Sequence, residues 1–132
     1  MTAAKAGQSL TGVWDGRYFY PRSLPPMSFV ATLIETATML AGTTHEPAGM
    51  AVRYATLQGR RAGSSVAFVK TYDDTGETGE RPHPIDYRGV LNGDATEIEG
   101  VWHIPGHWSG RFLMIRSPGK TIAASREIAE QV

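Results

Sequence analysis

A few polar side chains could do acid–base chemistry in this chain. His83 is the best candidate for a general acid or base, because an unperturbed imidazole changes its charge near physiological pH. Glu46 could partner His83 or Lys70 if its side chain points inward. A carboxylate next to a lysine is more often a structural ion pair than a catalytic dyad. The catalytic residues therefore stay unknown, and a non-enzymatic role is favoured.

Metal and cofactor chemistry has little support in the residue pattern. His103 and His107 flank the turn Pro105–Gly106 and could converge, but zinc needs further ligands that the sequence does not place. The chain has 0 cysteines, which excludes disulfides and thiolate metal sites. It also has no Gly-x-Ser-x-Gly motif and no phosphate-binding loop. Neither a metal nor a cofactor is predicted.

Short segments rich in β-branched and aromatic residues, separated by Gly, Pro and Asn, must position these groups. This rhythm is typical of an all-β sandwich or barrel. Tight turns are predicted at Pro47–Gly49, Arg61–Gly63, Asn92–Asp94 and Pro105–Gly106. The expected strands are residues 10–20, 27–36, 40–46, 52–60, 64–72, 83–91, 95–104 and 107–116.

These strands predict one closed barrel. Their connections are too short for crossover helices, so neighbouring strands should be antiparallel, and closure would remove both open sheet edges. The fold expected is an eight-stranded antiparallel up-and-down β-barrel with a narrow, largely apolar interior. The barrel domain is predicted over 10–116, after a flexible N-terminus at 1–9 and before a tail at 117–132 that is a short helix or a frayed end.

Alternation along each strand predicts which side chains line the interior. In 52–60 the pattern is ambiguous, because Val52 and Tyr54 compete with Ala55 and Leu57. Glycines inside strands, such as Gly16, often mark bends or places that need room. The residues expected to contact a ligand are Trp14, Tyr18, Phe29, Thr44, Glu46, Phe68, Lys70, His83, Tyr87, Trp102, Trp108 and Phe112.

The outer faces and the charge balance bear on partners. The 13 basic and 13 acidic residues cancel, so no nucleic acid or membrane partner is expected, and the pair Arg60–Arg61 is interpreted as a solvated turn. Residues 1–8 lack the apolar core of a signal peptide, which favours a cytoplasmic location. A large outward apolar set predicts a homodimer or homotetramer. Its members are Val13, Val30, Ile34, Val69, Val90, Val101, Leu113 and Ile115.

Five short motifs follow one another along the predicted barrel. They are Leu10–Trp14 (LTGVW, with a Gly-X-Trp opening), Arg53–Arg60 (RYATLQGR), Val66–Tyr72 (VAFVKTY), Asp86–Gly89 (DYRG) and Glu99–Trp102 (EGVW). Together they resemble the calycins, and most closely the avidins and streptavidins. The similarity spans residues 10–116, and Phe68 stands where those proteins carry a ligand-stacking tryptophan. The resemblance implies the barrel fold and a cavity at one barrel end.

The departures from that pattern argue against biotin. Gly16 stands where an asparagine is expected, and Phe112 lies near an expected aspartate. Thr44 and Glu46 occupy the region that supplies a tyrosine and a serine. A buried urea without these partners would lose several hydrogen bonds, each costly when left unmade.

Three functions are left open by the sequence. The first is binding of a small, mainly apolar or aromatic molecule in the barrel, with Tyr18, Tyr87 and His83 orienting it. The second is a small calycin-type enzyme, an isomerase or cyclase, that uses His83 or Glu46 as base and a tyrosine hydroxyl as stabiliser. The third is a filled barrel that acts as a self-assembling or partner-binding structural module.

Overall fold

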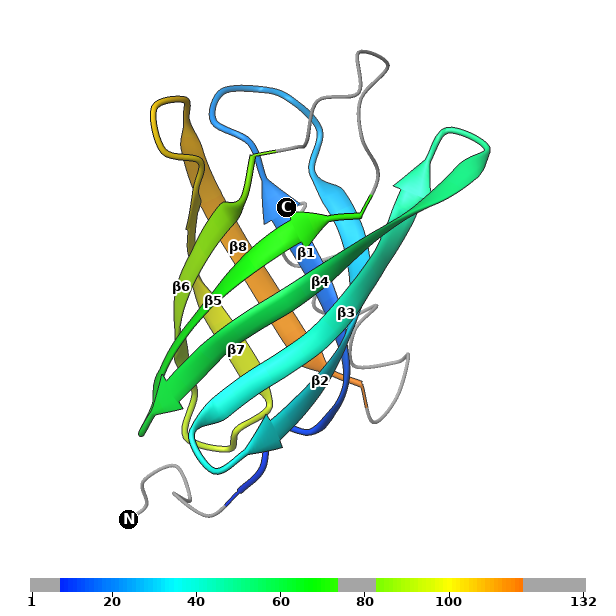
Figure 1. Cartoon of the computed structure of the whole chain (residues 1–132). Helices are drawn as coiled ribbons and strands as arrows, with labels where there is room; N and C mark the ends of the chain where they lie inside the picture. The colour runs from blue at the N-terminus through cyan, green and yellow to red at the C-terminus, as the bar shows by residue number, and fades with distance from the viewer. Residues whose placement is uncertain (1–7, 74–82, 118–132) are drawn as a thin grey trace.

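The computed structural model describes residues 8–73 and 83–117 and contains a closed all-β barrel (Figure 1). Eight antiparallel strands form it, as the sequence predicts. The C-terminal tail from residue 118 lies outside the described residues. The strands are β1 (Gly12–Phe19), β2 (Met27–Thr36), β3 (Met39–Ala48), β4 (Ala51–Ala62), β5 (Ser65–Tyr72), β6 (Ile85–Leu91), β7 (Glu97–His103) and β8 (Ser109–Arg116).

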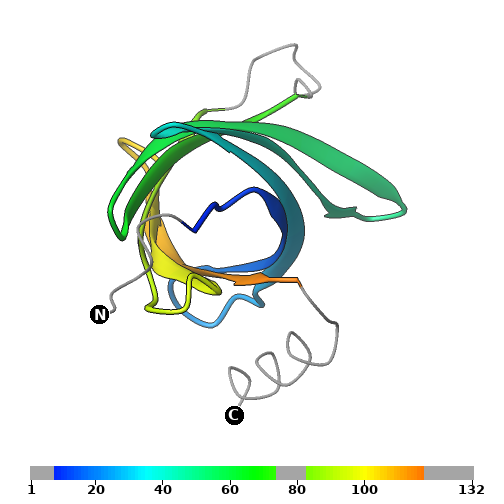
Figure 2. The same ribbon diagram turned by 90° about the horizontal axis from the view of Figure 1, so that it is seen from below.

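Each strand pairs with its sequence neighbours, and β1 closes the ring against β8 (Figure 2). Trp14 shows the closure, because its backbone lies opposite Ala31 on β2 and opposite Arg116 on β8. The register places one alternating face of every strand toward the interior. Closure leaves no unpaired sheet edge among the eight strands.

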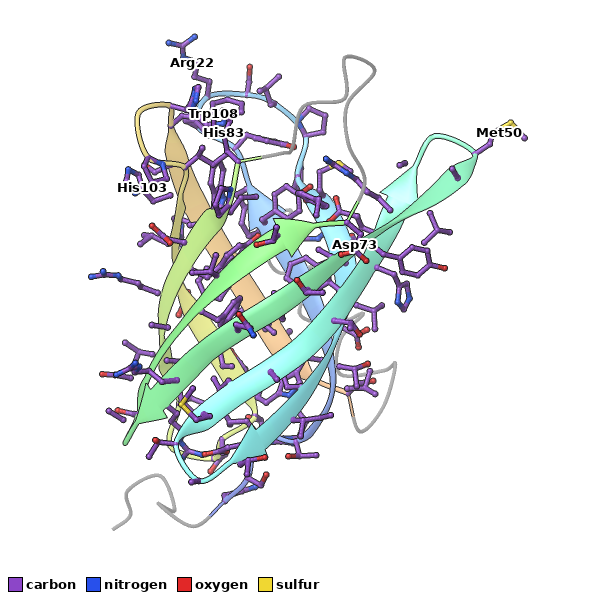
Figure 3. The ribbon with its side chains drawn as sticks, in the orientation of Figure 1. Arg22, Met50, Asp73, His83, His103 and Trp108 are labelled. Atoms are coloured by element: carbon purple, nitrogen blue, oxygen red, sulfur yellow. The ribbon has the colours of Figure 1, made fainter. Side chains whose placement is uncertain are left out.

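The hairpin between β3 and β4 is longer than the sequence predicts. The turn expected at Pro47–Gly49 is displaced, because β3 continues to Ala48 and pairs with Ala51, leaving Gly49 and Met50 as the turn. Gly49 has a φ of 64°, a left-handed conformation that glycine adopts without steric cost. The hairpin extends beyond the neighbouring strands, with Met50 at its tip (Figures 1 and 3).

The ambiguous strand β4 is resolved in favour of its second alternative. Ala55 and Leu57 are 1% and 2% exposed, whereas Val52 and Tyr54 are exposed on the outer face. Trp108 is a correction to the expected interior set, because its side chain is 40% exposed. It precedes β8, which begins at Ser109, so strand alternation does not apply to it.

One end of the barrel is sealed by residues 8–11, and we call this end the base. Leu10 is fully buried there, and its carbonyl accepts a hydrogen bond of 2.9 Å from Trp14 Nε1. The Arg116 guanidinium lies 4.6 Å above the Trp14 ring and donates to the carbonyl oxygens of Ser9 and Thr11. The segment before β1 is thus part of the packed interior.

Arg61 also seals the base, which corrects the expectation of a solvated Arg60–Arg61 turn. Arg61 is 5% exposed and lies on β4. It donates to the carbonyl of Gln8 at 2.6 Å and pairs with Glu35 at 3.2 Å. The same Glu35 oxygen accepts the Leu10 amide at 2.8 Å. The Arg61 guanidinium is buried and paired inside the fold, because β4 extends two residues further than predicted and places Arg61 on the inner face.

The opposite end carries the β1–β2, β3–β4, β5–β6 and β7–β8 connections, and we call it the loop end. Figure 3 shows Arg22, Met50, Asp73 and Trp108 around it.

The eight members of the outer apolar set differ in exposure, and Val30 is half-buried. Five members, Val13, Ile34, Val69, Val90 and Val101, are between 38% and 61% exposed. Leu113 and Ile115 on β8 are only 4% and 5% exposed although they stand outside the interior cluster, so both faces of β8 are covered there. The oligomeric state stays a prediction. Over residues 8–73 and 83–117, no helix has the length and apolar character needed to cross a membrane.

Candidate functional site

A buried ion pair stands inside the barrel toward its loop end. Lys70 on β5 and Glu46 on β3 are 0% and 3% exposed, and the Lys70 Nζ lies 2.9 Å from the Glu46 Oε1. The Tyr18 hydroxyl donates to the Glu46 Oε2 at 2.7 Å, and the Tyr72 hydroxyl donates to Oε1 at 3.0 Å. We call Tyr18, Glu46, Lys70 and Tyr72 the interior polar cluster.

Aromatic rings surround the ammonium of this cluster. The Lys70 Nζ lies 4.6 Å from the ring centre of Phe29, 4.9 Å from that of Tyr18 and 4.8 Å from that of Tyr72. The Tyr87 ring is 5.8 Å away. Distances below about 6 Å permit cation–π attraction, which is stronger in a desolvated site. The four rings and Glu46 together form a cage for one cation.

Burial shifts the protonation of the cluster. It lowers the pKa of the Lys70 ammonium below its ordinary value of 10.5, and the attraction of Glu46 opposes this shift. Burial likewise raises the pKa of the Tyr18, Tyr72 and Tyr87 phenols above 10.0. The tyrosines are therefore neutral hydrogen-bond donors over the physiological pH range.

We expect the cluster to contribute little net stability for the charges that it buries. Moving two charges out of water costs several kcal/mol for each ion, and their attraction often only offsets this cost. An apolar pair of similar volume would serve a purely structural core as well or better. The presence of the cluster therefore points to a role beyond packing.

A second polar group lies close by on the same strand face. Thr44 is 1% exposed, two residues before Glu46, and among the described residues its Oγ1 has no hydrogen-bond partner. A buried hydroxyl left unsatisfied costs about 1–3 kcal/mol. Its strand neighbours are small, Ala31 on β2 and Ala55 on β4. The wall of the barrel near Glu46 thus offers a free hydroxyl among small side chains.

An aromatic rim lies above the cluster at the loop end. The ring centres of Tyr20 and Trp108 are 5.2 Å apart, and that of Trp102 lies 6.0 Å from Tyr20 and 6.4 Å from Tyr18. Trp102 is fixed by a hydrogen bond of 3.0 Å from its Nε1 to the Phe19 carbonyl. Four rings therefore frame this end, Tyr18 from β1, Tyr20 from the β1–β2 connection, Trp102 from β7 and Trp108 from the β7–β8 connection.

The half of the interior toward the base is tightly filled. Trp14, Leu33, Leu57, Ile98 and Met114 are each at most 2% exposed. Above them, Phe68 and Tyr87 stack with ring centres 5.0 Å apart, and Phe112 meets Tyr87 at 4.9 Å.

Gly16 leaves room for the Phe29 ring, as the sequence suggests for a glycine inside a strand. A Cβ built on Gly16 would lie 2.2 Å from the Phe29 ring.

The interior is least covered toward the loop end. The largest residual exposure of the interior apolar set, 8% each, belongs to Tyr18, Tyr72 and Ile85. Those residues lie toward the loop end, so a ligand would enter there.

The structure places His107 next to His83, a contact that the sequence did not predict. His83 is exposed before β6, and its ring centre lies 4.6 Å from that of His107. His83 is therefore a rim residue, and the described partners of Glu46 are Lys70 and the two tyrosines. Over residues 8–73 and 83–117, no three His, Asp or Glu side chains converge as a metal site would require.

Sequence reasoning identified most of the cluster but missed part of it. Glu46 meets Lys70, one of the two partners that the sequence left open. Tyr72 and Arg53 were absent from the predicted ligand set, yet Tyr72 bonds Glu46 and the Arg53 guanidinium lies 3.5 Å above the Tyr72 ring. Tyr20 was missed as well. Tyr72 follows Lys70 by two residues and Tyr20 follows Tyr18 by two, so the period of a strand could have found both.

Two surface hollows lie apart from this cluster. One, of about 350 Å³, is bounded by Phe19–Pro21 and Ser109–Arg111, where β1 ends and β8 begins. The other, of about 330 Å³, lies on the outer face of β6 and β7 beside Asp86 and His103. Neither is lined by the interior polar cluster.

Comparisons with protein-family models, with curated proteins and with solved structures found no match to this chain. The eight-stranded closed barrel is compatible with a calycin-like fold. Membership of the calycin superfamily stays a prediction.

The tyrosines make stability sensitive to alkali. In the unfolded chain these phenols ionise near pH 10, whereas in the folded barrel Tyr18, Tyr72 and Tyr87 stay protonated. The unfolded state then binds fewer protons, so stability falls as pH rises above about 10. Lys70 acts in the opposite sense, because its lowered pKa makes stability rise with pH up to about 10.5.

We therefore expect the urea midpoint to fall steeply between about pH 10 and 11.5, where three phenols outweigh one amine. Tyr87→Phe should make this fall shallower, since it removes one of the three groups. Tyr54→Phe, at a 56% exposed tyrosine, is the matched control. A midpoint that stays constant through this window would contradict the assignment.

Proposed function

We propose that the barrel binds a small molecule at its loop end. The aromatic or apolar body of the ligand would lie against the rings of Tyr18, Tyr20 and Trp102, and a polar group would face Glu46 and Lys70. The observation that carries the proposal is the buried ion pair with its two tyrosine donors, which is expected to stabilise the fold little by itself. Such a pocket, mainly apolar with a few convergent polar groups, is typical of ligand sites.

The Thr44 hydroxyl supports the same site, since it leaves a hydrogen-bonding group inside the barrel for a ligand. Biotin is not the ligand that we expect. The surface of Gly16 is covered by the Phe29 ring, and Phe112 packs against Tyr87, so neither position supplies a polar partner for a urea group.

Calorimetric titration with 2-naphthalenemethanol, an aromatic alcohol, tests this proposal. We expect saturable binding that is lost in Ile85→Trp, because Ile85 lies on the inner face of β6 at the loop end and a larger ring would fill the entrance. The matched control is Val69→Trp, which adds the same ring on the outer face. Equal binding by both variants would place the ligand outside the barrel, and absent binding by the wild type, with no small molecule in native mass spectra, would refute the proposal.

A second candidate is a small enzyme acting on an apolar substrate in the same place. Glu46 with the Tyr18 and Tyr72 hydroxyls at 2.7 and 3.0 Å combines a carboxylate base with neutral donors. This candidate differs from the first in that the ligand is consumed.

A further inference from the structure

Lys70 is an amine held inside the barrel among aromatic rings, and amines have covalent chemistry of their own. The chain has three lysines, and Lys70 is the one that the structure describes; Lys5 and Lys120 lie outside the described residues. Its Nζ is buried among four rings and bonded to one carboxylate. A neutral amine in such a place is a nucleophile toward carbonyl carbon.

The surroundings of Lys70 suit both the neutral amine that attacks a carbonyl carbon and the positively charged iminium that results. Desolvation favours the neutral amine, and Glu46 at 2.9 Å can take the proton that Lys70 gives up. An iminium formed at the same nitrogen would carry the same single positive charge as the ammonium. The Glu46 carboxylate would then remain its counter-ion, and the Phe29, Tyr18 and Tyr72 rings would still face it.

We propose that Lys70 captures an apolar or aromatic aldehyde as a Schiff base, with Glu46 as proton carrier and counter-ion. This inference rests on the proposed function, because the aldehyde must first enter the loop end. It assigns that ligand a reactive group, and the unpartnered Thr44 hydroxyl, on the same strand face as Glu46, would be available as a donor to the carbonyl oxygen.

The reaction is a condensation without oxidation or reduction. Glu46 takes a proton from the ammonium, and the Lys70 nitrogen pair then forms a bond to the carbonyl carbon while the carbon–oxygen π pair moves to oxygen. Glu46 returns its proton to that oxygen and then removes one from nitrogen. It passes this second proton to the hydroxyl, which leaves as water as the nitrogen pair forms the carbon–nitrogen double bond. The ammonium and the aldehyde thus yield an iminium and one water.

Reductive trapping tests the inference on the whole chain. The protein is incubated at neutral pH with 2-naphthaldehyde and sodium cyanoborohydride, and the modified lysine is located by peptide mass spectrometry. We expect a naphthylmethyl group on Lys70 at a rate several-fold above that at Lys5 or Lys120, since a lowered pKa leaves a larger share of the amine neutral. Lys70→Met should abolish this adduct and leave the others unchanged.

The parallel titration with 2-naphthalenemethanol separates the two proposals. If the alcohol binds but Lys70 is not modified faster than Lys5 and Lys120, the Schiff base is overturned and the binding site stands. If the alcohol does not bind and Lys70 is not modified, both proposals fall. Because the adduct is mapped on the wild-type chain, the result does not depend on whether Lys70→Met folds.

Discussion

Replacing Glu46 by glutamine is expected to lower the free energy of unfolding by about 3–5 kcal/mol at neutral pH, the cost of removing one partner from a buried ion pair. Lys70 is 0% exposed, so without Glu46 it would either keep an ammonium that lacks a counter-charge or release its proton, and both cost stability. Glutamine has nearly the volume of glutamate, but its one amide oxygen can replace only one of the two carboxylate oxygens that accept from the Tyr18 and Tyr72 hydroxyls. The loss therefore reports the removed charge together with one lost acceptor, and not a cavity, and urea denaturation measures it.

The double variant Glu46→Gln with Lys70→Met is the decisive control. It removes both charges, and replacing a buried pair by neutral groups of similar volume is often neutral or stabilising by about 1–4 kcal/mol. We expect the double variant to be more stable than Glu46→Gln alone. If the double variant is the less stable of the two, the ion pair stabilises the fold, and its presence no longer supports a role in binding.

The same pair shows how far sequence alone could go. The alternation of β5 correctly placed Phe68, Lys70 and Tyr72 on one inner face, and the outward charges of β1 placed Trp14 and Tyr18 inside. The alternation of side chains depends only on the sequence of one strand, so the inner face of each strand can be predicted independently of the other strands.

What the sequence could not provide is the meeting of strands that are not neighbours. Glu46 lies on β3 and Lys70 on β5, with β4 between them, so their contact depends on the stagger and closure of the barrel. Arg61 was misinterpreted for a related reason. Its partners, Glu35 and the Gln8 carbonyl, come from segments that only the closed fold brings to the base.

Predictions from the sequence were also wrong near turns and on the outer faces of strands. Trp108 shares the parity of β8 but stands before its first residue, so the alternation was extended too far. Leu113 and Ile115 stand at the outward-facing positions of β8 and are nevertheless buried. Alternation predicts the direction in which a side chain points, but it does not predict whether other atoms cover that side chain.

Trp14 is the residue whose truncation should cost the most at the base. Trp14→Ala is expected to lower the free energy of unfolding by about 3–5 kcal/mol, as for other buried tryptophans. The ring is fully buried and lies under the Arg116 guanidinium, and its Nε1 holds the Leu10 carbonyl at 2.9 Å. Its loss would leave a cavity and release the segment that seals this end.

Two variants separate these contributions by urea denaturation. Trp14→Phe keeps most of the ring but leaves the Leu10 carbonyl without its donor, so we expect a smaller loss, of about 1–3 kcal/mol. Trp108→Ala removes the same side chain at a 40% exposed position and should cost clearly less than Trp14→Ala. If the two alanine variants lose equal stability, the base is not the anchored end of the barrel. A large loss confined to Trp14 would place the rigid core at the base and leave the loop end free to admit a ligand.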